Sequence, residues 1–303
     1  MKLSQIRDIL AVAEHGSLRA AARQLDVAQP AITRSIRELE DELGATLFER
    51  HARGVRLTDM GKAFVRRATT VEAELRRARE EIAQLRGRHR GEVSVALSSA
   101  PSVTLLPTAF AAFRRHYPDV VLKLSENFFP AIQADLASGR LDFYVGPVEA
   151  PMAQPQFAMD PLYENTRVGL ARKGHPLIAR RSLAELVDAQ WVRVTMSAGG
   201  NDSAFEAMFA MHGLAAPQVA LHARSNLLAL LAVANSDLLA IVPQPWLALP
   251  TMAGLFDPIV LDAPLPASPI FLVRRHDMPL TPVAEHFSDL IRRAALNHGR
   301  HGV

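Results

Sequence analysis

The 303-residue chain contains no cysteine, so disulfide bonds, thiolate metal sites and cysteine nucleophiles are all excluded. It also lacks a long apolar run, because the longest, residues 227–234, is far shorter than the roughly 20 residues that cross a bilayer. Lys2 opens an amphipathic pattern without the continuous apolar core of a signal peptide. We therefore expect a cytoplasmic protein without a membrane partner.

The sequence also lacks the short motifs of common enzymes. No nucleophile elbow, P-loop, HExxH motif or dinucleotide fingerprint occurs, and Gly199-Gly200 has neither a third glycine nor the spacing for a nucleotide. His298 and His301 have a metal-like spacing but stand in a polar tail, and His175 precedes proline in a turn. We expect no metal, no cofactor and no catalytic residue.

Charge is present but unevenly distributed. Residues 1–90 carry 18 basic and 13 acidic side chains, a net charge of +5, whereas residues 91–303 have a net charge of −2. A basic front joined to a slightly acidic remainder indicates a polyanionic partner for the front. The length favours two or three domains, and the 49% apolar content is enough for large cores.

The basic front is predicted to form three helices. The first ends at Gly16, Ser17 caps the second, and after a tight turn the third opens at Gln29-Pro30 and ends at Gly44. This pattern is typical of a helix–turn–helix whose last helix reads the major groove. Its acidic far end, residues 38–42, would repel phosphate. The residues predicted to face DNA are Gln29, Pro30, Thr33, Arg34 and Arg37.

These side chains suit base recognition, since glutamine can bond adenine, arginine can bond guanine, and threonine offers a hydroxyl and a methyl group. The alternative is a solvated polar face on an ordinary three-helix bundle. Residues 47–57 read as a hairpin, the wing of a winged helix, and Arg53 near its tip could reach a minor groove or phosphates. Thr58 then caps a long helix.

That long helix spaces its apolar residues by four and three over three heptads, which favours pairing with a second helix and thus dimerisation. The alternative is a surface helix packed on its own domain, for which a wider apolar stripe would be expected. The seven positions, called the seam below, are Phe64, Ala68, Val71, Leu75, Ala78, Ile82 and Leu85.

Together these motifs resemble the winged helix of the LysR-type transcriptional regulators. The resemblance places base reading on Gln29, Pro30, Thr33 and Arg34 and the wing contact on Arg53. The family often has serine at the position of Thr33. The motifs that carry the resemblance are Gly16-Ser17-Leu18, Ala21-Ala22, Gln29-Pro30-Ala31, Leu39-Glu40, Leu43-Gly44, Leu47-Phe48-Glu49-Arg50, Leu57-Thr58 and Gly61.

Beyond a linker at residues 86–91, strand-like and helix-like segments alternate, which predicts parallel sheets with crossover helices, including one helix from Val103 to His116. This part resembles the LysR-type effector domain, two α/β lobes similar to periplasmic solute-binding proteins. One departure is Asn235-Ser236-Asp237, where the family commonly has Gly-x-Gly; asparagine and aspartate tolerate left-handed conformations, so we expect the fold to survive. The landmarks are Tyr117-Pro118-Asp119-Val120, Gly139-Arg140-Leu141-Asp142-Phe143 and His175-Pro176-Leu177.

The predicted fold is therefore an N-terminal winged helix-turn-helix, a long coiled-coil linker helix, and a C-terminal two-lobed α/β effector domain of periplasmic-binding-protein type. The expected boundaries are 1–57 for DNA binding, 58–90 for the linker helix and hinge, and 91–303 for the effector domain. Within the last, we expect lobe I at 91–161 and 266–303, and lobe II at 162–265.

Ligands of α/β sheets bind beyond the carboxyl ends of strands. Two turns of small polar residues follow such strands here, the first at residues 98–102 and the second at residues 195–201. Each precedes a helix N-terminus, which suits an anion; the alternative is two ordinary strand-to-helix turns that use serine for capping. The candidate effector residues are Ser98, Ser99, Ala100, Ser102, Asn127, Phe128, Thr195, Met196 and Ser197.

Three functions remain open. The first is a transcriptional regulator that binds double-stranded promoter DNA and a small, anionic effector. The resemblance implies a homotetramer, a dimer of dimers, with RNA polymerase as a further candidate partner. The second is a DNA-binding regulator that responds to a protein partner and has no small-molecule effector. The third is an enzyme or solute-binding module with an incidental basic front.

Overall fold

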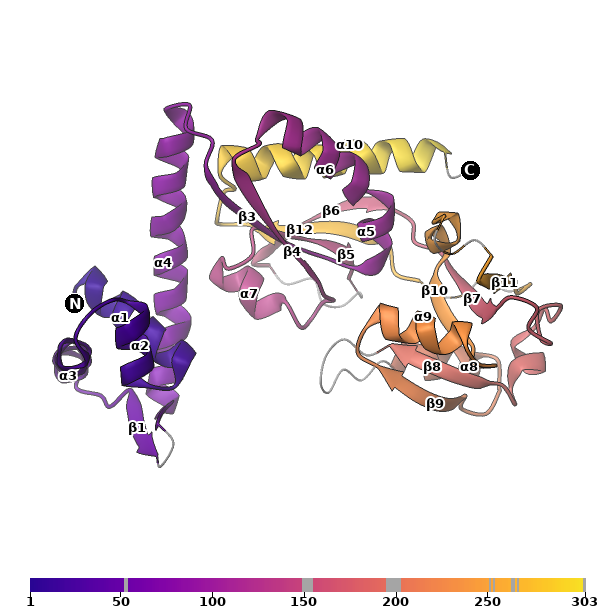
Figure 1. Cartoon of the computed structure of the whole chain (residues 1–303), viewed down its shortest axis with the longest axis horizontal. Coiled ribbons are helices and arrows are strands. Elements are labelled where there is room, and N and C mark those ends of the chain that lie inside the picture. Colours follow the sequence, from indigo (N-terminus) through magenta and orange to yellow (C-terminus); the bar gives the residue numbers. More distant parts are fainter. Residues whose placement is uncertain are drawn as a thin grey trace. The chain divides into compact units, whose positions relative to one another are not determined.

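The computed structural model describes residues 1–51, 54–148, 155–194, 203–250, 252, 254–262, 265 and 267–301. The chain divides into two compact units, residues 1–91 with 134–142, and residues 92–133 with 143–303. Figure 1 traces both units along the sequence. No helix among the described residues is long and apolar enough to cross a membrane.

The first unit is a winged helix-turn-helix followed by one long helix. The strands of its wing pair antiparallel, from Phe48 opposite Leu57 to His51 opposite Gly54, which confirms the predicted hairpin. Two small apolar clusters hold the helices together, one centred on Val12 and Ile32 and one on Ile9 and Leu39. The elements are α1 (Leu3–His15), α2 (Leu18–Gln24), α3 (Gln29–Leu43), β1 (Phe48–His51), β2 (Gly54–Leu57) and α4 (Asp59–Leu85).

The short segment around α7 (Gln133–Ser138) also belongs to the first unit, where an ion pair ties it to α4. Arg77 and Asp142 are 2.9 Å apart, and their side chains are only 6% and 4% exposed. Arg77 also donates to the carbonyl of Leu141, and Arg76 donates to the carbonyl of Gly139. These contacts hold residues 139–142, which follow α7, against the second half of α4.

The second unit contains two lobes, each built on its own sheet. The sheet of the first lobe has the order β4-β3-β5-β12-β6, and α5, α6 and α10 pack against it. The elements are β3 (Gly91–Leu97), α5 (Ser99–Thr104), α6 (Leu106–His116), β4 (Val120–Glu126), β5 (Phe143–Pro147), β6 (Phe157–Tyr163), β12 (Ile270–Arg275) and α10 (Pro282–His301).

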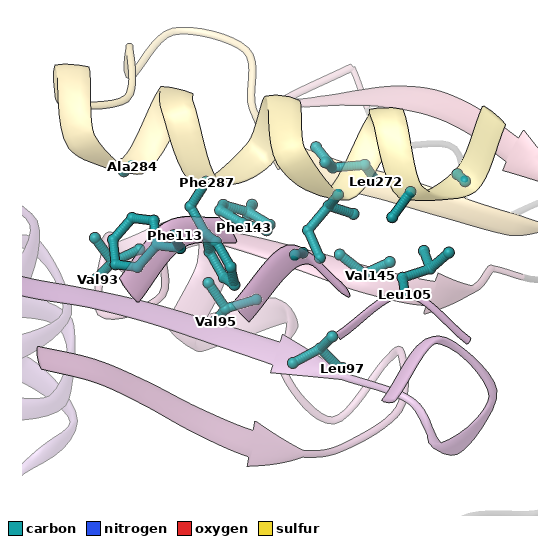
Figure 2. Packing of buried hydrophobic residues seen from close by; sticks show 14 of the residues in the cluster. Val93, Val95, Leu97, Leu105, Phe113, Phe143, Val145, Leu272, Ala284 and Phe287 are labelled. Carbon is teal, nitrogen blue, oxygen red and sulfur yellow. The ribbon is translucent and has the colours of Figure 1, made fainter. Parts of the chain in front are cut away.

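Figure 2 shows the core of this first lobe, where Phe287 of α10 points toward Phe113 of α6 and Phe143 of β5. The ring centroids of Phe113 and Phe287 are 4.9 Å apart in an edge-to-face arrangement, which aromatic pairs prefer. Val93, Val95 and other residues of the strands close the cluster from below. The sheet and its covering helices therefore form one continuous apolar core.

The second lobe has a three-stranded sheet of order β10-β7-β11 and a parallel pair, β8-β9. A bridge between Trp191 and Leu239 links the two. The elements are β7 (Arg167–Arg172), η1 (Leu183–Leu186), β8 (Gln190–Val194), α8 (Ser203–Met211), β9 (Gln218–Ala223), α9 (Asn226–Ala234), β10 (Ala240–Pro243), η2 (Gln244–Ala248) and β11 (Phe256–Ile259).

The expectation of parallel sheets is only partly correct. Strands β3 and β5 are parallel, as are β8 and β9, but β12 runs antiparallel to β5 and β6, and β7 runs antiparallel to β10 and β11. Helix–strand alternation predicts parallel neighbours where a crossover helix joins strands that pair. Strand β12 instead returns to its sheet only after the chain has built the second lobe, so no crossover sets its direction.

The single helix expected from Val103 to His116 is wrong as well. Two helices occur here, α5 and α6, and they divide at Leu105. Pro107 lies in the first turn of α6, where it has no N–H to donate to a preceding carbonyl. The sequence analysis also did not predict β6, β11 or α10.

The buried ion pair gives a stability prediction. Replacing Asp142 by alanine leaves the Arg77 guanidinium buried without its charge partner, so unfolding free energy should fall by about 3–5 kcal/mol. Replacing Asp135, which pairs with Arg140 at a mostly exposed position of the same segment, should cost at most about 1 kcal/mol. Urea unfolding of the full chain measures both, and equal losses would contradict this account.

Candidate DNA-reading surface and effector cleft

Helix α3 presents one apolar and one polar face. It begins at Gln29, with Pro30 in its first turn, and Ile32, Ile36 and Leu39 are buried. Its C-terminal residue is followed by Gly44, whose φ of 62° is the left-handed conformation expected there. The predicted start and end of this helix are observed, and so is the buried face except at Leu43, which was expected to be buried but is 42% exposed.

The polar face carries the five residues that the sequence predicts to face DNA. Gln29, Pro30, Arg34 and Arg37 are exposed, and Thr33 is half-buried. The Thr33 hydroxyl donates to the carbonyl of Gln29 at 3.1 Å. Because its proton is engaged within the helix, this side chain has only its methyl group and an acceptor oxygen to offer a base.

The turn before α3 and the base of the wing are held by close backbone contacts. Ser17 accepts a hydrogen bond from the N–H of Ala20, as expected of a cap. Asp26 adopts a φ of 53° in the tight turn. Val55 donates to the carbonyl of Gly16 at 2.9 Å, and a Cβ on Gly54 would lie 2.3 Å from that oxygen. Arg53, the predicted wing contact, lies outside the described residues.

Glu40 has a role that the sequence analysis did not anticipate. It was grouped with acidic residues that repel phosphate, but its side chain is half-buried. Its Oε1 atom accepts hydrogen bonds from the N–H groups of Leu47 at 2.6 Å and Phe48 at 3.1 Å. One signal was available: Glu40 follows Ile36 by four residues and therefore lies beside the buried stripe.

The seam on α4 divides into two parts. Ala68 is buried and Phe64 packs against the cluster of Ile9, Leu39 and Leu47, so these two contact their own unit. Leu75 is half-buried and Ala78 is exposed. Val71, Ile82 and Leu85 are 42%, 55% and 75% exposed. The apolar stripe is therefore unpaired mainly in its C-terminal half, within the part of the chain described.

The first predicted effector turn is more enclosed than expected. Ser98, Ser99 and Ala100 are buried, and only Ser102 is partly accessible, with its hydroxyl donating to the carbonyl of Ser98. Asn127 and Phe128 are half-buried directly after β4. The second predicted turn, with Thr195, Met196 and Ser197, lies outside the described residues.

Tyr144, which the sequence analysis missed, lies beneath this turn. Burial raises the pKa of Tyr144 well above its usual range, whereas a hydrogen bond with the backbone of Phe129 acts in the opposite direction. Its hydroxyl also donates to the carbonyl of Pro147 at 3.3 Å. A Cβ on Gly146 would collide with that hydroxyl at 2.1 Å, so this neutral phenol is enclosed on several sides.

The two lobes touch beside these residues. The indole N–H of Trp246 in η2 donates to the carbonyl of Ser99 at 3.3 Å, and Val103 of α5 packs against the core of the second lobe. Asn226, at the start of α9, donates to the carboxylate of Glu126 at the end of β4. Desolvation raises the pKa of Glu126, although the hydrogen bond from Asn226 opposes this.

The other sequence features turn out to be structural. The N–H of Leu177 donates to Nδ1 of the buried His175, so the ring proton is on Nε2, which donates to the carbonyl of Asp237. The departure at Asn235-Ser236-Asp237 leaves the fold intact, and none of the three residues has a positive φ. Asn235 and Ser236 donate to carbonyls at the end of α9. Among the described residues, no group of three or more His, Asp or Glu could hold a metal.

Comparison with known proteins matches both units. The description "LysR substrate binding domain" fits residues 86–296, and "Bacterial regulatory helix-turn-helix protein, lysR family" fits residues 3–62. The HTH-type transcriptional regulator GbpR of Azospirillum brasilense is 28% identical over 97% of this chain and 87% of its own length.

The SDS degradation transcriptional activation protein of Pseudomonas sp. (strain ATCC 19151) is 31% identical over 95% of each chain. The solved structure of CbnR, a LysR family transcriptional regulator, shares the fold with a TM-score of 0.70 and 24% identity, covering 97% of this chain and 99% of that one. With an N-terminal helix-turn-helix and a two-lobed effector-binding region, this chain belongs to the LysR family of bacterial transcriptional regulators.

Proposed function

We propose that this regulator reads promoter DNA with the first two turns of α3, in a two-fold pair held by α4. The observation that carries the proposal is the exposed polar face of α3, with Gln29, Arg34 and Arg37 at the helix end that follows the turn. A recognition helix contacts base edges through its N-terminal residues. Pro30, Thr33 and, from the wing, Arg53 complete the proposed contact set.

The unpaired half of the seam supports a helix-to-helix dimer. Val71, Ala78, Ile82 and Leu85 are exposed at heptad spacing, and such a stripe is stable in water only when it is covered. A second apolar surface supports a dimer of dimers. On α9 alone, Leu227, Leu228 and Leu231 are each more than half exposed. We therefore propose a homotetramer that acts in the cytoplasm, with RNA polymerase as a further partner.

We place the effector between the lobes, next to Ser102, Asn127 and Phe128. The support is the proximity of lobe-to-lobe contacts, in which Trp246 bonds Ser99 and Asn226 bonds Glu126. Because Ser98 and Ser99 are buried, their hydroxyls would shape the floor of the site, and an anion would depend on residues 195–197. The proposed domain boundaries are 1–57, 58–90 and 91–303, with lobe I at 91–161 and 266–303 and lobe II at 162–265. The chain is assigned no catalytic step.

Loss of a base-reading arginine should change specificity. Arg34→Ala should cost about 1–3 kcal/mol of binding free energy and relax the preference at one position of each half-site. Arg53→Ala should weaken binding to all sequences alike, with a shallower salt dependence, because its proposed contact is to phosphate. Titration of specific and random duplexes at several salt concentrations measures both. Equal loss on both duplexes in Arg34→Ala would remove Arg34 from the reading set.

Charge in the seam should separate the protomers. Val71→Glu combined with Leu75→Glu puts carboxylates where two apolar stripes meet, so association and operator affinity should fall together. Ala63→Glu adds charge at an exposed position outside the seam and serves as the control. Analytical ultracentrifugation and mobility shift provide the two readouts. A double variant that associates and binds DNA like the parent would show that the seam is not the interface.

The effector proposal is tested with defined small carboxylates and sulfonates. A binding anion should raise the unfolding free energy by about 2.7 kcal/mol at a concentration 100 times its Kd. It should also change the emission of Trp246, which bridges the lobes; a Trp191→Phe background isolates that signal. If neutral sugars stabilise the protein and none of the anions does, the anionic assignment is wrong.

A further inference from the structure

Leu47, between α3 and the wing, is held from both sides of its own backbone. Its N–H donates to Glu40, a residue of the proposed reading helix α3, at 2.6 Å. Its carbonyl accepts from the N–H of Thr58 at 3.0 Å, while the Thr58 hydroxyl lies 2.7 Å from the carbonyl oxygen of Thr46 and 3.4 Å from that of Leu47. Because Thr58 is the N-cap of α4, one residue connects the reading helix to the dimerisation helix.

The approach of α4 to this residue is unusually close. A Cβ on Gly61 would lie 2.1 Å from the Leu47 carbonyl oxygen, so only glycine allows the first turn of α4 to sit there. Thr58 accepts a hydrogen bond from the N–H of Gly61 at 2.9 Å, which closes that turn around the same point. The start of α4 is thus fixed by backbone contacts and leaves little freedom to rotate.

The side chain of Leu47 makes the third connection. It is 1% exposed and packs with Ile9 of α1, Leu39 of α3 and Phe64 of α4. Glu40 contributes a charge-assisted pair of hydrogen bonds, because the same oxygen also accepts from the N–H of Phe48. Reading helix, wing and linker helix therefore all meet at one peptide.

We propose that Glu40, acting through Leu47, is a positioning residue that sets the angle between α3 and α4 and thereby the preferred spacing of the two DNA half-sites. The inference rests on the proposed roles of α3 and α4. Glu40 itself stands at the start of the fourth turn of α3, beyond the residues proposed to touch bases. Its influence on DNA is therefore geometric.

Small changes at this point are amplified along the helix. The 27 residues of α4 span about 40 Å, so a tilt of about 5° displaces the far end by about 3 Å, close to one base-pair step. A two-fold pair docks on half-sites at a fixed separation along the duplex. If the angle between α3 and α4 is less tightly fixed, the protein should therefore bind pairs of half-sites at altered spacings more readily.

The experiment uses the full chain and duplexes with two copies of a half-site, selected by the parent protein from random DNA. The spacer between the copies is varied in steps of one base pair. Glu40→Ala removes both hydrogen bonds, Glu40→Gln retains an acceptor oxygen, and Glu38→Ala removes the same charge from an exposed position on the same helix. Gly61→Ala disturbs the contact with the Leu47 carbonyl from the side of α4, independently of Glu40. Thermal unfolding of each variant identifies those that remain folded.

The parent and Glu38→Ala should prefer one spacing by about tenfold over neighbouring ones, and Glu40→Gln should retain most of that preference. Glu40→Ala, or Gly61→Ala if only that variant folds, should flatten the preference below about threefold or move it by a base pair, with single half-site binding little changed. Uniform loss of affinity at every spacing, with the same preferred one, would show a merely structural role and overturn the inference. A parent that binds no paired half-sites would instead refute the proposed function.

Discussion

The packing of α4 against its own unit, together with its proposed pairing with a second α4, is the constraint on which the first unit depends. Gly61 and Ala68 are buried on one face near the start of the helix, and Ala73, Arg77 and Gln84 are buried on a different face further along, whereas Val71, Ile82 and Leu85 of the seam remain exposed. The buried positions are occupied by small or hydrogen-bonded residues, which allow α4 to pack closely in its own unit. The exposed apolar positions Val71, Ile82 and Leu85 are left for the proposed partner helix.

The buried guanidinium of Arg77 on α4 has both a charge partner and a carbonyl acceptor. Arg77 would be costly to bury alone, but its guanidinium meets the carboxylate of Asp142 and the carbonyl of Leu141. The residue after Asp142 is Phe143, which is fully buried in the core of the first lobe. The ion pair is thus one peptide bond away from a rigid β-strand of the effector-binding region.

Features fixed by neighbouring residues could be predicted from the sequence. The caps at Ser17 and Thr58 and the left-handed glycines at positions 16 and 44 depend only on local chain geometry, and all four are observed. Features that depend on contacts between residues distant in the sequence could not be predicted in this way. The partners of Glu40 are seven and eight residues away, that of Asp142 is 65 residues away, and the direction of β12 is set by a strand more than a hundred residues earlier.

The effector turn shows a third kind of difficulty. Serine at the end of a strand can contact a ligand, cap a helix or lie buried beneath a site equally well, because its hydroxyl both donates and accepts. What distinguishes them is the neighbourhood, here Tyr144 beneath Ser98 and Trp246 beside Ser99, and neither neighbour is close in sequence. The sequence makes this turn a candidate for ligand binding but cannot determine which of its side chains face outward.

The close approach of Gly61 to the Leu47 carbonyl also fixes the helical phase of everything that follows it. Each residue along α4 advances the helix by 100°, so one residue inserted after Gly61 would rotate Val71 and the rest of the exposed stripe away from a partner by that angle. Chimaeras that exchange reading heads among relatives must therefore join the two chains without changing the residue count between this glycine and the seam. A junction chosen by sequence similarity alone would preserve both halves and still misalign them.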